Sequence, residues 1–368
     1  MEKRDVIVYR EPGRYAGWPA NYGIWSWGDE IVVGFTAGYP KEDAGFHARD
    51  KDRPFITMQA RSLDGGSSWQ AHRMPIRTPG NRGVSADEHM RPDLGAAYAI
   101  QHGMENAPVD CPGGINLAHP DLALLCARTG LGAGTLAFFY VSTDRCHTWE
   151  GPYRLPDLGQ TGIEARTDYL VSDARTCTFL LTASWASGRE GRGVFCARTS
   201  DGGQSFRLLS WVARSDEGFV IMPSSVRLTP SRILTAVRCR GRGGDVVAAR
   251  NWIDLYLSED DGLSWRYLGR PVEETGPGGN PPSMIRLRDG RLCLTYGYRA
   301  APYGIRAKLS ADEGRAWGDE IILRDDGGSH DLGYPRTVQR TDGTIVTVYY
   351  FNDRPGGAAY IAATLWRP

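Results

Sequence analysis

The sequence has almost no lysine and no net charge. Of its 43 basic residues only four are lysines and 39 are arginines, and 43 acidic residues balance them. A neutral chain is poorly suited to bind nucleic acid or an anionic membrane surface, so neither is expected as a partner. Codon bias is the simplest explanation of the arginine excess. The alternative is that some of these guanidinium groups bind carboxylates bidentately.

Motifs for metals, redox centres and nucleotides are also missing. The seven cysteines are odd in number and include no C-x-x-C pair, which indicates buried thiols. The seven histidines show no ligand spacing of the H-E-x-x-H kind. The glycine clusters at 130–134 and 188–193 lie between predicted strands, where hairpin loops are expected and phosphate-binding loops are not. We therefore expect neither a metal nor another cofactor.

Long apolar runs are absent as well. The first residues, MEKRDVIVYREP, are charged throughout, and no later run approaches the length of a membrane-spanning helix. These features predict a soluble protein with no membrane partner, either cytoplasmic or with its signal peptide already removed. Hydrophobic residues make up 41% of the chain, which is ample for a core, and no Pro/Ser-rich linker divides it.

One short phrase, with the form S/T-x-D-x-G-x-x-W/F, is repeated five times. The copies are SLDGGSSW (62–69), STDRCHTW (142–149), TSDGGQSF (199–206), SEDDGLSW (258–265) and SADEGRAW (310–317). In a tight hairpin the aspartate accepts N–H groups of the turn, the glycine takes a positive φ, and the aromatic residue fills space beside the next strand. The copies start 52 to 80 residues apart, which is the length of about four strands and is typical of propeller blades.

These repeats resemble the Asp-box (BNR) repeats of the sialidase (neuraminidase) superfamily, and the resemblance covers essentially the whole chain. It implies an all-β fold, a six-bladed β-propeller of four-stranded antiparallel blades, in a single domain over residues 1–368. Five repeats account for five blades, and strands expected at 334–340, 344–351 and 359–366 supply most of the sixth. The β-type run at 5–9 is expected to be its outer strand and to close the ring.

The strand order of a blade predicts where a site would lie. The repeats join the third and fourth strands, so the loops between second and third strands and the links between blades share the opposite face. Those loops and links, notably 36–53 and 77–114, are rich in ionisable residues. We expect the functional site on that face, close to the propeller axis.

The resemblance also implies a set of catalytic groups. Exo-sialidases use three arginines to hold the sugar carboxylate, a carboxylic acid on a mobile loop as acid/base, and a tyrosine nucleophile activated by a glutamate. By resemblance, Asp50, twelve residues before the first repeat, is the acid/base, and Tyr334 in GYPRTVQRTDG is the nucleophile. Arg238, at the end of ILTAVR, resembles one arginine of the triad, and Arg299 or Arg306 another.

The chain departs from the family pattern at two of these positions. The arginine expected on the first strand is replaced by Ala20 or a neighbour, and only Arg14 upstream could substitute for it. The glutamate that should pair with the tyrosine falls near Met222, so Glu217 is the nearest acid. Further substrate-binding candidates on the same face are Arg53, His89, Arg166 and Arg336.

Three functions are compatible with this pattern. The first, which we expect, is a sialidase-like glycoside hydrolase that releases a terminal acidic sugar from a glycan. The second is a polysaccharide lyase acting at a uronic acid, with Tyr334, His89 and His330 transferring protons while arginine neutralises the carboxylate. The third is a non-catalytic glycan-binding propeller. A carbohydrate partner is common to all three.

Overall fold

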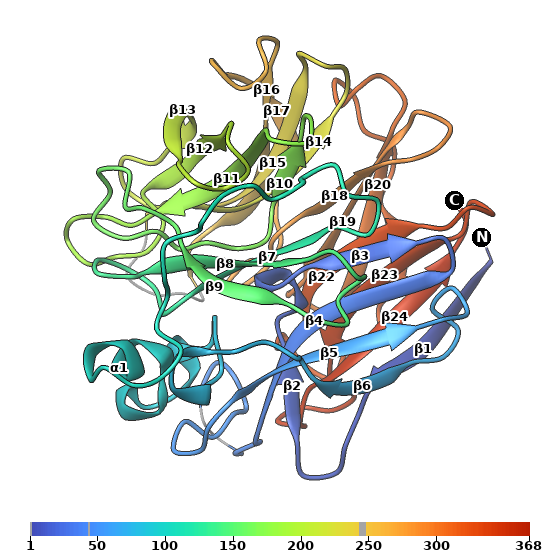
Figure 1. Ribbon diagram of the computed structural model, residues 1–368. Helices are drawn as coiled ribbons and strands as arrows, with labels where there is room; N and C mark the ends of the chain where they lie inside the picture. Colours follow the sequence, from blue (N-terminus) through green and yellow to red (C-terminus); the bar gives the residue numbers. More distant parts are fainter. Residues whose placement is uncertain (1, 43–44, 243–247) are drawn as a thin grey trace.

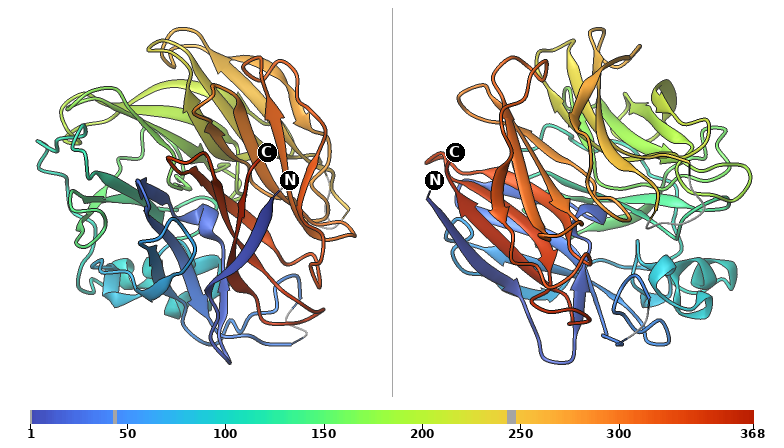
Figure 2. Two further views of the ribbon diagram at one scale, coloured as in Figure 1. Left: turned by 90° about the vertical axis from the view of Figure 1, so that its right-hand side faces the viewer. Right: turned by 180° about the vertical axis from the view of Figure 1, so that it is seen from behind.

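The computed structural model of the protein describes residues 2–42, 45–242 and 248–368. Its strands form six antiparallel sheets arranged around a central axis, with only short helical segments between them (Figures 1 and 2). The expected all-β, six-bladed propeller is therefore confirmed. No helix within the described ranges is long and apolar enough to cross a membrane.

The blades follow one another along the chain, and each runs from an inner strand at the axis to an outer strand at the rim. From the axis outward, blade one contains β2 (Tyr15–Gly17) and β3 (Ile24–Trp27), both paired with β4 (Glu30–Gly38), then β5 (Ile56–Ser62) and β6 (Gln70–Arg73). Blade two contains β7 (Ala123–Arg128), β8 (Ala137–Ser142) and β9 (Glu150–Arg154). Blade three contains β10 (Tyr169–Val171), β11 (Cys177–Ala183), β12 (Gly193–Thr199) and β13 (Arg207–Arg214).

The second half of the ring is more regular. Blade four contains β14 (Phe219–Arg227), β15 (Ile233–Arg240), β16 (Asn251–Ser258) and β17 (Arg266–Val272). Blade five contains β18 (Ser283–Arg286), β19 (Leu292–Tyr298), β20 (Gly304–Ser310) and β21 (Ile321–Arg324). Blade six contains β22 (Gly333–Gln339), β23 (Ile345–Phe351), β24 (Tyr360–Trp366) and β1 (Lys3–Tyr9).

The N-terminal strand closes the ring, as the sequence predicts. Strand β1 pairs antiparallel with β24, in a register that runs from Lys3 opposite Trp366 to Tyr9 opposite Ile361. The two ends of the chain therefore lie side by side at the rim of blade six (Figure 1). This pairing covers the edge of β24, which would otherwise be open to another chain.

Blades one and two depart from the predicted four strands. In blade one the inner strand is split by the short helix η1 (Pro19–Asn21), which begins after Trp18 takes a left-handed φ of 56°. In blade two the innermost strand is missing. Ser85 takes its place, because Ser85 N donates to Arg128 O at 2.9 Å and Ser85 Oγ accepts from Arg128 N at 3.3 Å.

The link from blade one to blade two explains the missing strand. It folds into short helices instead of a strand, namely η2 (Pro79–Asn81), η3 (Asp87–His89), η4 (Pro92–Leu94) and α1 (Ala96–Gln101). Two of these helices have proline in their first turn, a residue that lacks the N–H needed inside a sheet. The link brings η3, and with it Glu88 and His89, to the axis.

The five repeats form the hairpins between third and fourth strands. In the first, Asp64 Oδ1 accepts a hydrogen bond from Ser68 N, and Ser62 Oγ accepts one from Gly66 N, each at 2.8 Å. Gly66 has a φ of 88°, and Cys146, which replaces it in the second repeat, takes 67°. The aspartates therefore serve their own turns.

Hydrophobic clusters fill the spaces between neighbouring blades. One example is the contact of blade six with blade one, where Val346 and Val348 of β23 pack with Val33 and Phe35 of β4. Five similar clusters join the other blade pairs. The seven cysteines are buried and free, as expected. Burial of this apolar surface holds the blades as a ring, which fixes the positions of the loops at the axis.

Candidate active site

A pocket of about 210 Å³ opens at the axis, on the face opposite the repeat hairpins. We call it the central pocket. Loops and strand ends from every blade contribute to its lining, which consists of Asn21, Phe46, His47, Arg49, Glu88, His89, Leu131, Arg166, Glu190, Arg238, Arg240, Gly278, Arg299 and Tyr334. Five arginines and two glutamates in this set make the pocket strongly cationic. It is thus suited to an anionic ligand.

Tyr334 is held in a strained position at the start of β22. Its φ is 51°, in the left-handed region, and its backbone N donates a hydrogen bond to Asn280 Oδ1 at 2.7 Å. The side chain packs against a small apolar cluster at the axis, which includes Ala20 and Met222. A non-glycine residue in this conformation is uncommon and is often found at functional sites.

The hydroxyl of Tyr334 lies among guanidinium groups. Arg238 Nη1 donates a hydrogen bond to it at 3.0 Å, and Arg299 lies 5.5 Å from the ring centre. Burial opposes ionisation of the phenol, but the positive charges of Arg238, Arg299 and Arg166 outweigh burial and lower the pKa of Tyr334 below its usual value. The phenolate is therefore more accessible here than in water.

Three arginines of the pocket share one arrangement, in which the protein holds two nitrogens and leaves one terminal nitrogen free. The held pairs are Arg166 Nε with Asn21 Oδ1 and Nη1 with Glu164 O, Arg240 Nε with Asn251 Oδ1 and Nη2 with Gly278 O, and Arg299 Nε with Leu332 O and Nη2 with Tyr350 Oη. Among the described residues, nothing accepts from the remaining terminal nitrogens. Guanidinium groups fixed in this way can bind a carboxylate with little further ordering.

A buried carboxylate positions a histidine at the pocket wall. His47 Nδ1 lies 2.6 Å from Asp331 Oδ1, and Tyr15 and Tyr350 donate their hydroxyls to the same carboxylate at 3.0 Å each. Burial would raise the pKa of Asp331, but the hydrogen bond from His47 and the charge of Arg299 lower it overall, so the carboxylate accepts and His47 Nδ1 donates. Burial lowers the pKa of His47, which leaves a neutral ring whose Nε2 is available to a ligand.

A second wall comes from the 3₁₀ helix η3. The ring of His89 stacks on Trp18, with centroids 3.6 Å apart and an angle of 7° between the planes. Glu88 pairs with the buried Arg128, and its backbone oxygen accepts from Arg49 Nη2 at 3.3 Å. Burial keeps the pKa of His89 well below the usual value, so this ring is neutral. The wall is therefore rigid and aromatic.

Glu190 enters the pocket from the loop between β11 and β12. Its carboxylate has no hydrogen-bond or ion-pair partner among the described residues, although it lies at the pocket lining. The fully buried Glu164 fixes the base of this loop, because its Oε1 accepts from Gly191 N at 3.2 Å and from Ser184 Oγ at 2.8 Å. The same oxygen accepts from Gly132 N at 3.2 Å and so joins the loop to blade two.

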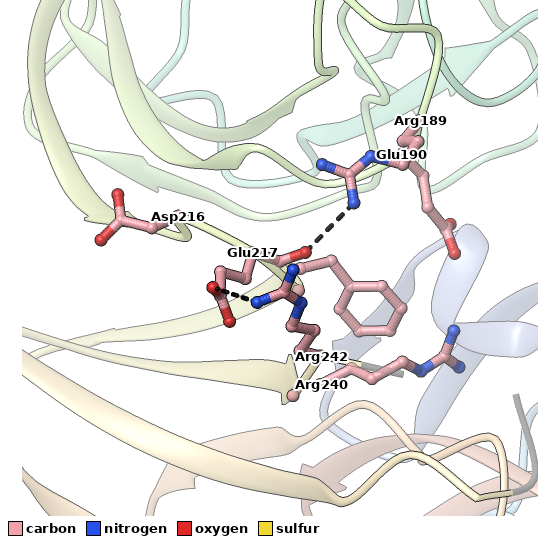
Figure 3. Close-up of a pocket in the computed structure, with 9 residues that line it drawn as sticks. Arg189, Glu190, Asp216, Glu217, Arg240 and Arg242 are labelled. Carbon is pink, nitrogen blue, oxygen red and sulfur yellow. Dashed lines mark hydrogen bonds and ion pairs between the residues drawn. The ribbon is translucent and has the colours of Figure 1, made fainter. Parts of the chain in front are cut away.

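A second and larger pocket, of about 800 Å³, lies next to the first. We call it the outer pocket. It is lined by Arg189, Glu190, Asp216, Glu217, Gly218, Phe219, Arg240, Gly241 and Arg242. Figure 3 shows Glu190 and Arg240 reaching from opposite sides toward the same space, and the ion pair of Glu217 with Arg242 nearby. Glu190 and Arg240 line both pockets.

Five residues expected at the site from the sequence line the central pocket. They are Tyr334, His89, Arg166, Arg238 and Arg299. A sixth, Glu217, lines the outer pocket instead, where its carboxylate is 3.0 Å from Arg242 Nη1. It does not reach Tyr334, and the position expected for a glutamate partner is filled by Met222, whose Sδ lies 3.5 Å from Arg238 Nη1.

Asp50 and Arg53 lie outside both pockets. After His47 the chain turns back to enter β5. In this turn the carboxylate of Asp50 accepts from Asp52 N at 3.0 Å and lies 3.9 Å from Lys41 Nζ. Arg53 stacks on the ring of Tyr39, with its guanidinium carbon 3.1 Å from the ring centre. Both side chains are used within the loop that carries them.

Arg306, Arg336 and Arg14 are also absent from the pocket linings. Arg306 is buried on β20, with its Nε 3.1 Å from Glu320 Oε1. Arg336 donates to the backbone oxygens of Ala20, Tyr22 and Thr167 and so ties blades one, three and six together. Arg14 lies 4.3 Å from the ring centre of Tyr39 and does not replace the missing arginine of the first strand.

Several pocket residues were not among those expected. Glu190 lies in the glycine cluster 188–193, which does form a hairpin loop, as predicted, but whose acid was not singled out. His47 and Arg240 stand close to expected residues in the sequence. The signal that would find all three is topological, since each lies in a loop after the second strand of a blade or at the end of that strand. No group of three histidine, cysteine or acidic side chains in the described ranges is arranged to hold a metal.

Comparisons with known proteins identify the fold. No protein-family model matches the chain, and no curated protein sequence does. A protein of unknown function from Dyadobacter fermentans is 20% identical over 99% of this chain and 98% of its own, with a TM-score of 0.71. The NanB sialidase of Streptococcus pneumoniae is 11% identical over 98% of this chain and 70% of its own, with a TM-score of 0.62.

A third similar structure is the GH93 α-L-arabinofuranosidase of Fusarium graminearum in complex with arabinobiose. It is 13% identical over 99% of this chain and 97% of its own, with a TM-score of 0.59. At such identities a likeness shows the fold alone. The likeness confirms the propeller fold that the resemblance to the sialidase superfamily implies.

Proposed function

We propose that the protein is a glycoside hydrolase that removes a terminal carboxylated sugar from a glycan, with Tyr334 as its nucleophile. The observation that carries this proposal is the hydrogen bond from Arg238 to the Tyr334 hydroxyl, in a pocket also lined by Arg166, Arg240 and Arg299, each with one terminal nitrogen that has no acceptor among the described residues. The same cluster of positive charge would bind the substrate carboxylate and favour the phenolate.

Tyrosine is a suitable nucleophile for such a substrate. An anomeric carbon that bears or adjoins a carboxylate repels an anionic carboxylate nucleophile, whereas a neutral phenol approaches without that repulsion and passes its proton to water as it attacks, a transfer that the neighbouring arginines favour. In this chain arginines lower the pKa of the phenol, in the place where sialidases use a glutamate. Attack on the anomeric carbon forms a bond to the Tyr334 oxygen and breaks the bond to the leaving oxygen.

Glu190 is the group best placed to protonate the leaving oxygen. It lines both pockets, so a glycosidic bond that crosses from one to the other passes beside its carboxyl group. Asp50, the residue expected in this role, has its carboxylate in a loop turn outside both pockets. In the second half of the reaction Glu190 would take a proton from water, which then releases the sugar from Tyr334.

One observation favours a polysaccharide lyase as a second candidate. The neutral His47, oriented by Asp331, presents Nε2 to the pocket as a base. In that reaction His47 removes the proton next to the uronate carboxylate, the arginines stabilise the resulting anion, and the leaving oxygen departs with a proton from Tyr334. The product carries a new C=C bond, which hydrolysis does not create.

A substrate panel tests the proposal. Methylumbelliferyl glycosides of sialic, glucuronic and galacturonic acids, and oligosaccharides that end in the same sugars, are incubated with the wild type and with Tyr334→Phe. The proposal predicts release of an intact acidic sugar by the wild type alone, and no turnover of a neutral arabinofuranoside. Growth of ultraviolet absorbance from an unsaturated uronate would indicate the lyase. Tight binding without any product would indicate a glycan-binding module.

A further inference from the structure

We propose that the outer pocket binds the part of the substrate that leaves, and that this part is an uncharged, hydroxyl-rich oligosaccharide. The inference rests on the proposed function, because it takes Glu190 as the group that separates the two halves of the substrate. Beyond that function, we assign a second binding site, the outer pocket, and the chemical class of the ligand that it binds.

The two pockets are adjacent and share two lining residues. Glu190 comes from the loop between β11 and β12, and Arg240 from the end of β15, and both line each pocket. Arg240 is fixed there, since its Nε donates to Asn251 Oδ1 at 3.1 Å and its Nη2 to Gly278 O at 2.8 Å. A glycan that spans both pockets would therefore place its glycosidic oxygen beside Glu190.

The charges of the two pockets differ in a way that separates their ligands. Five arginines face two glutamates in the central pocket, and Glu88 of these is already paired with Arg128. The outer pocket instead has three arginines and three acids, Arg189, Arg240 and Arg242 with Glu190, Asp216 and Glu217. An anion gains no net attraction from the second set. Hydroxyl groups, which both donate and accept, can use both kinds of side chain.

The outer pocket has one aromatic side chain, Phe219, in its lining. Phe219 is almost fully buried and lies at the lining, with the guanidinium carbon of Arg240 4.2 Å from its ring centre. In the same lining, Glu217 and Arg242 form an ion pair of 3.0 Å, and Arg189 Nη1 donates to Glu217 O at 3.1 Å. A carbohydrate matches this charged lining, because its hydroxyls can donate to the carboxylates and accept from the guanidinium groups.

The sizes of the pockets indicate an oligosaccharide. The outer pocket, at about 800 Å³, is several times larger than the central pocket, at about 210 Å³. If the central pocket takes one acidic sugar, the outer pocket has room for more than one neutral unit. The enzyme would then prefer an oligosaccharide to a small synthetic glycoside of the same terminal sugar.

The first test is a selectivity ratio, kcat/KM for an oligosaccharide divided by kcat/KM for the methylumbelliferyl glycoside of the same terminal sugar. Replacing both members of the ion pair, Glu217→Ala with Arg242→Ala, should lower this ratio about tenfold, the loss expected for charged hydrogen bonds. The matched control, Glu259→Ala with Arg266→Ala, removes an ion pair of 3.4 Å from a repeat hairpin and should leave the ratio unchanged. An equal fall with both substrates, or no fall, would overturn the proposal.

The second test does not need turnover. Lactose and arabinobiose are titrated into the wild type and into the Glu217→Ala/Arg242→Ala variant by calorimetry, with digalacturonic acid as an anionic probe. Neutral disaccharides should bind the wild type and lose about tenfold in affinity in the variant. Failure of both to bind the wild type would contradict the outer site. If they bind although no acidic glycoside is cleaved, the proposed function fails and the outer site stands.

Discussion

Arg238 and Tyr334, which lie 96 residues apart, meet at the axis through a hydrogen bond of 3.0 Å from Nη1 to the phenol oxygen. Arg238 belongs to β15 of blade four and Tyr334 to β22 of blade six, so the contact crosses the ring. It depends on the left-handed backbone at Tyr334, which turns the side chain toward the pocket. The charge environment that lowers the pKa of Tyr334 is thus a product of ring closure.

Arg166 is predicted to hold the substrate carboxylate. Arg166→Lys should raise KM for an acidic glycoside by about tenfold to a hundredfold, because lysine cannot keep the contacts with Asn21 and Glu164 and also reach the ligand. Arg306→Lys is the matched control, since Arg306 is buried but absent from both pocket linings. It should lower the melting temperature and leave KM unchanged. Steady-state kinetics with thermal melts check both variants, and equal KM effects would refute the assignment.

The acid is predicted to be Glu190 and not Asp50. Glu190→Gln should lower kcat/KM about a hundredfold or more on an oligosaccharide, and much less on a methylumbelliferyl glycoside, whose leaving group needs little protonation. Asp50→Asn should change either rate less than about twofold, because its carboxylate serves a loop turn. The rates of both variants on both substrates decide the question. A large loss in Asp50→Asn with normal activity in Glu190→Gln would reverse the assignment.

Glu164 should make the protein less stable as the pH rises. Burial and the charge of Glu190 raise the pKa of Glu164 to about 7 in the folded protein. The folded state therefore binds the proton more tightly than the unfolded chain, and the free energy of unfolding falls as the pH rises from about 4.5 to about 7. The glutamine in Glu164→Gln cannot ionise. Over the same pH range the unfolding free energy of this variant should therefore fall less than that of the wild type, and the difference should be up to about 3 kcal/mol. Urea unfolding at both ends of this range, with the surface variant Glu259→Gln as control, measures the difference.

The aspartates of the repeats are predicted to support stability alone. Asp260 Oδ1 accepts from Ser264 N at 2.9 Å within the hairpin of blade four, away from both pockets. Asp260→Asn should lower the free energy of unfolding by about 1 to 2 kcal/mol, since it weakens this turn. Activity per folded molecule should stay the same. A variant with normal stability and reduced turnover would show that this face has a functional part we have not assigned.

The sequence predicts most of the fold because each repeat marks one hairpin by its own local chemistry. It does not predict the missing strand of blade two. The link before that blade has proline in two helical turns, and only Ser85 pairs with β7 where a whole strand was expected. Tyr334 and Arg238 were predictable because they stand at strand ends next to the axis. Arg306, which resembles Arg299 in type and neighbourhood, lies on the third strand of blade five and is held there by Glu320.

The loops of the site were harder to predict. A loop sequence shows which residues it carries but not which of them face the ligand, because that depends on hydrogen bonds to distant segments. His47 is directed inward by Asp331, which is 284 residues away, whereas Asp50 in the same loop turns to Asp52. Glu190 owes its place to the buried Glu164, which has no distinguishing motif.

The central claim, that Tyr334 attacks the substrate, can be tested by trapping the covalent intermediate. Wild type is incubated with a fluorinated acidic glycoside that forms the glycosyl-enzyme and hydrolyses slowly, and the adduct is located by peptide mass spectrometry. We predict one added sugar on the peptide that contains Tyr334, no adduct in Tyr334→Phe, and a loss of turnover of at least about a thousandfold in that folded variant. An adduct on another residue, or normal turnover by Tyr334→Phe, would contradict it.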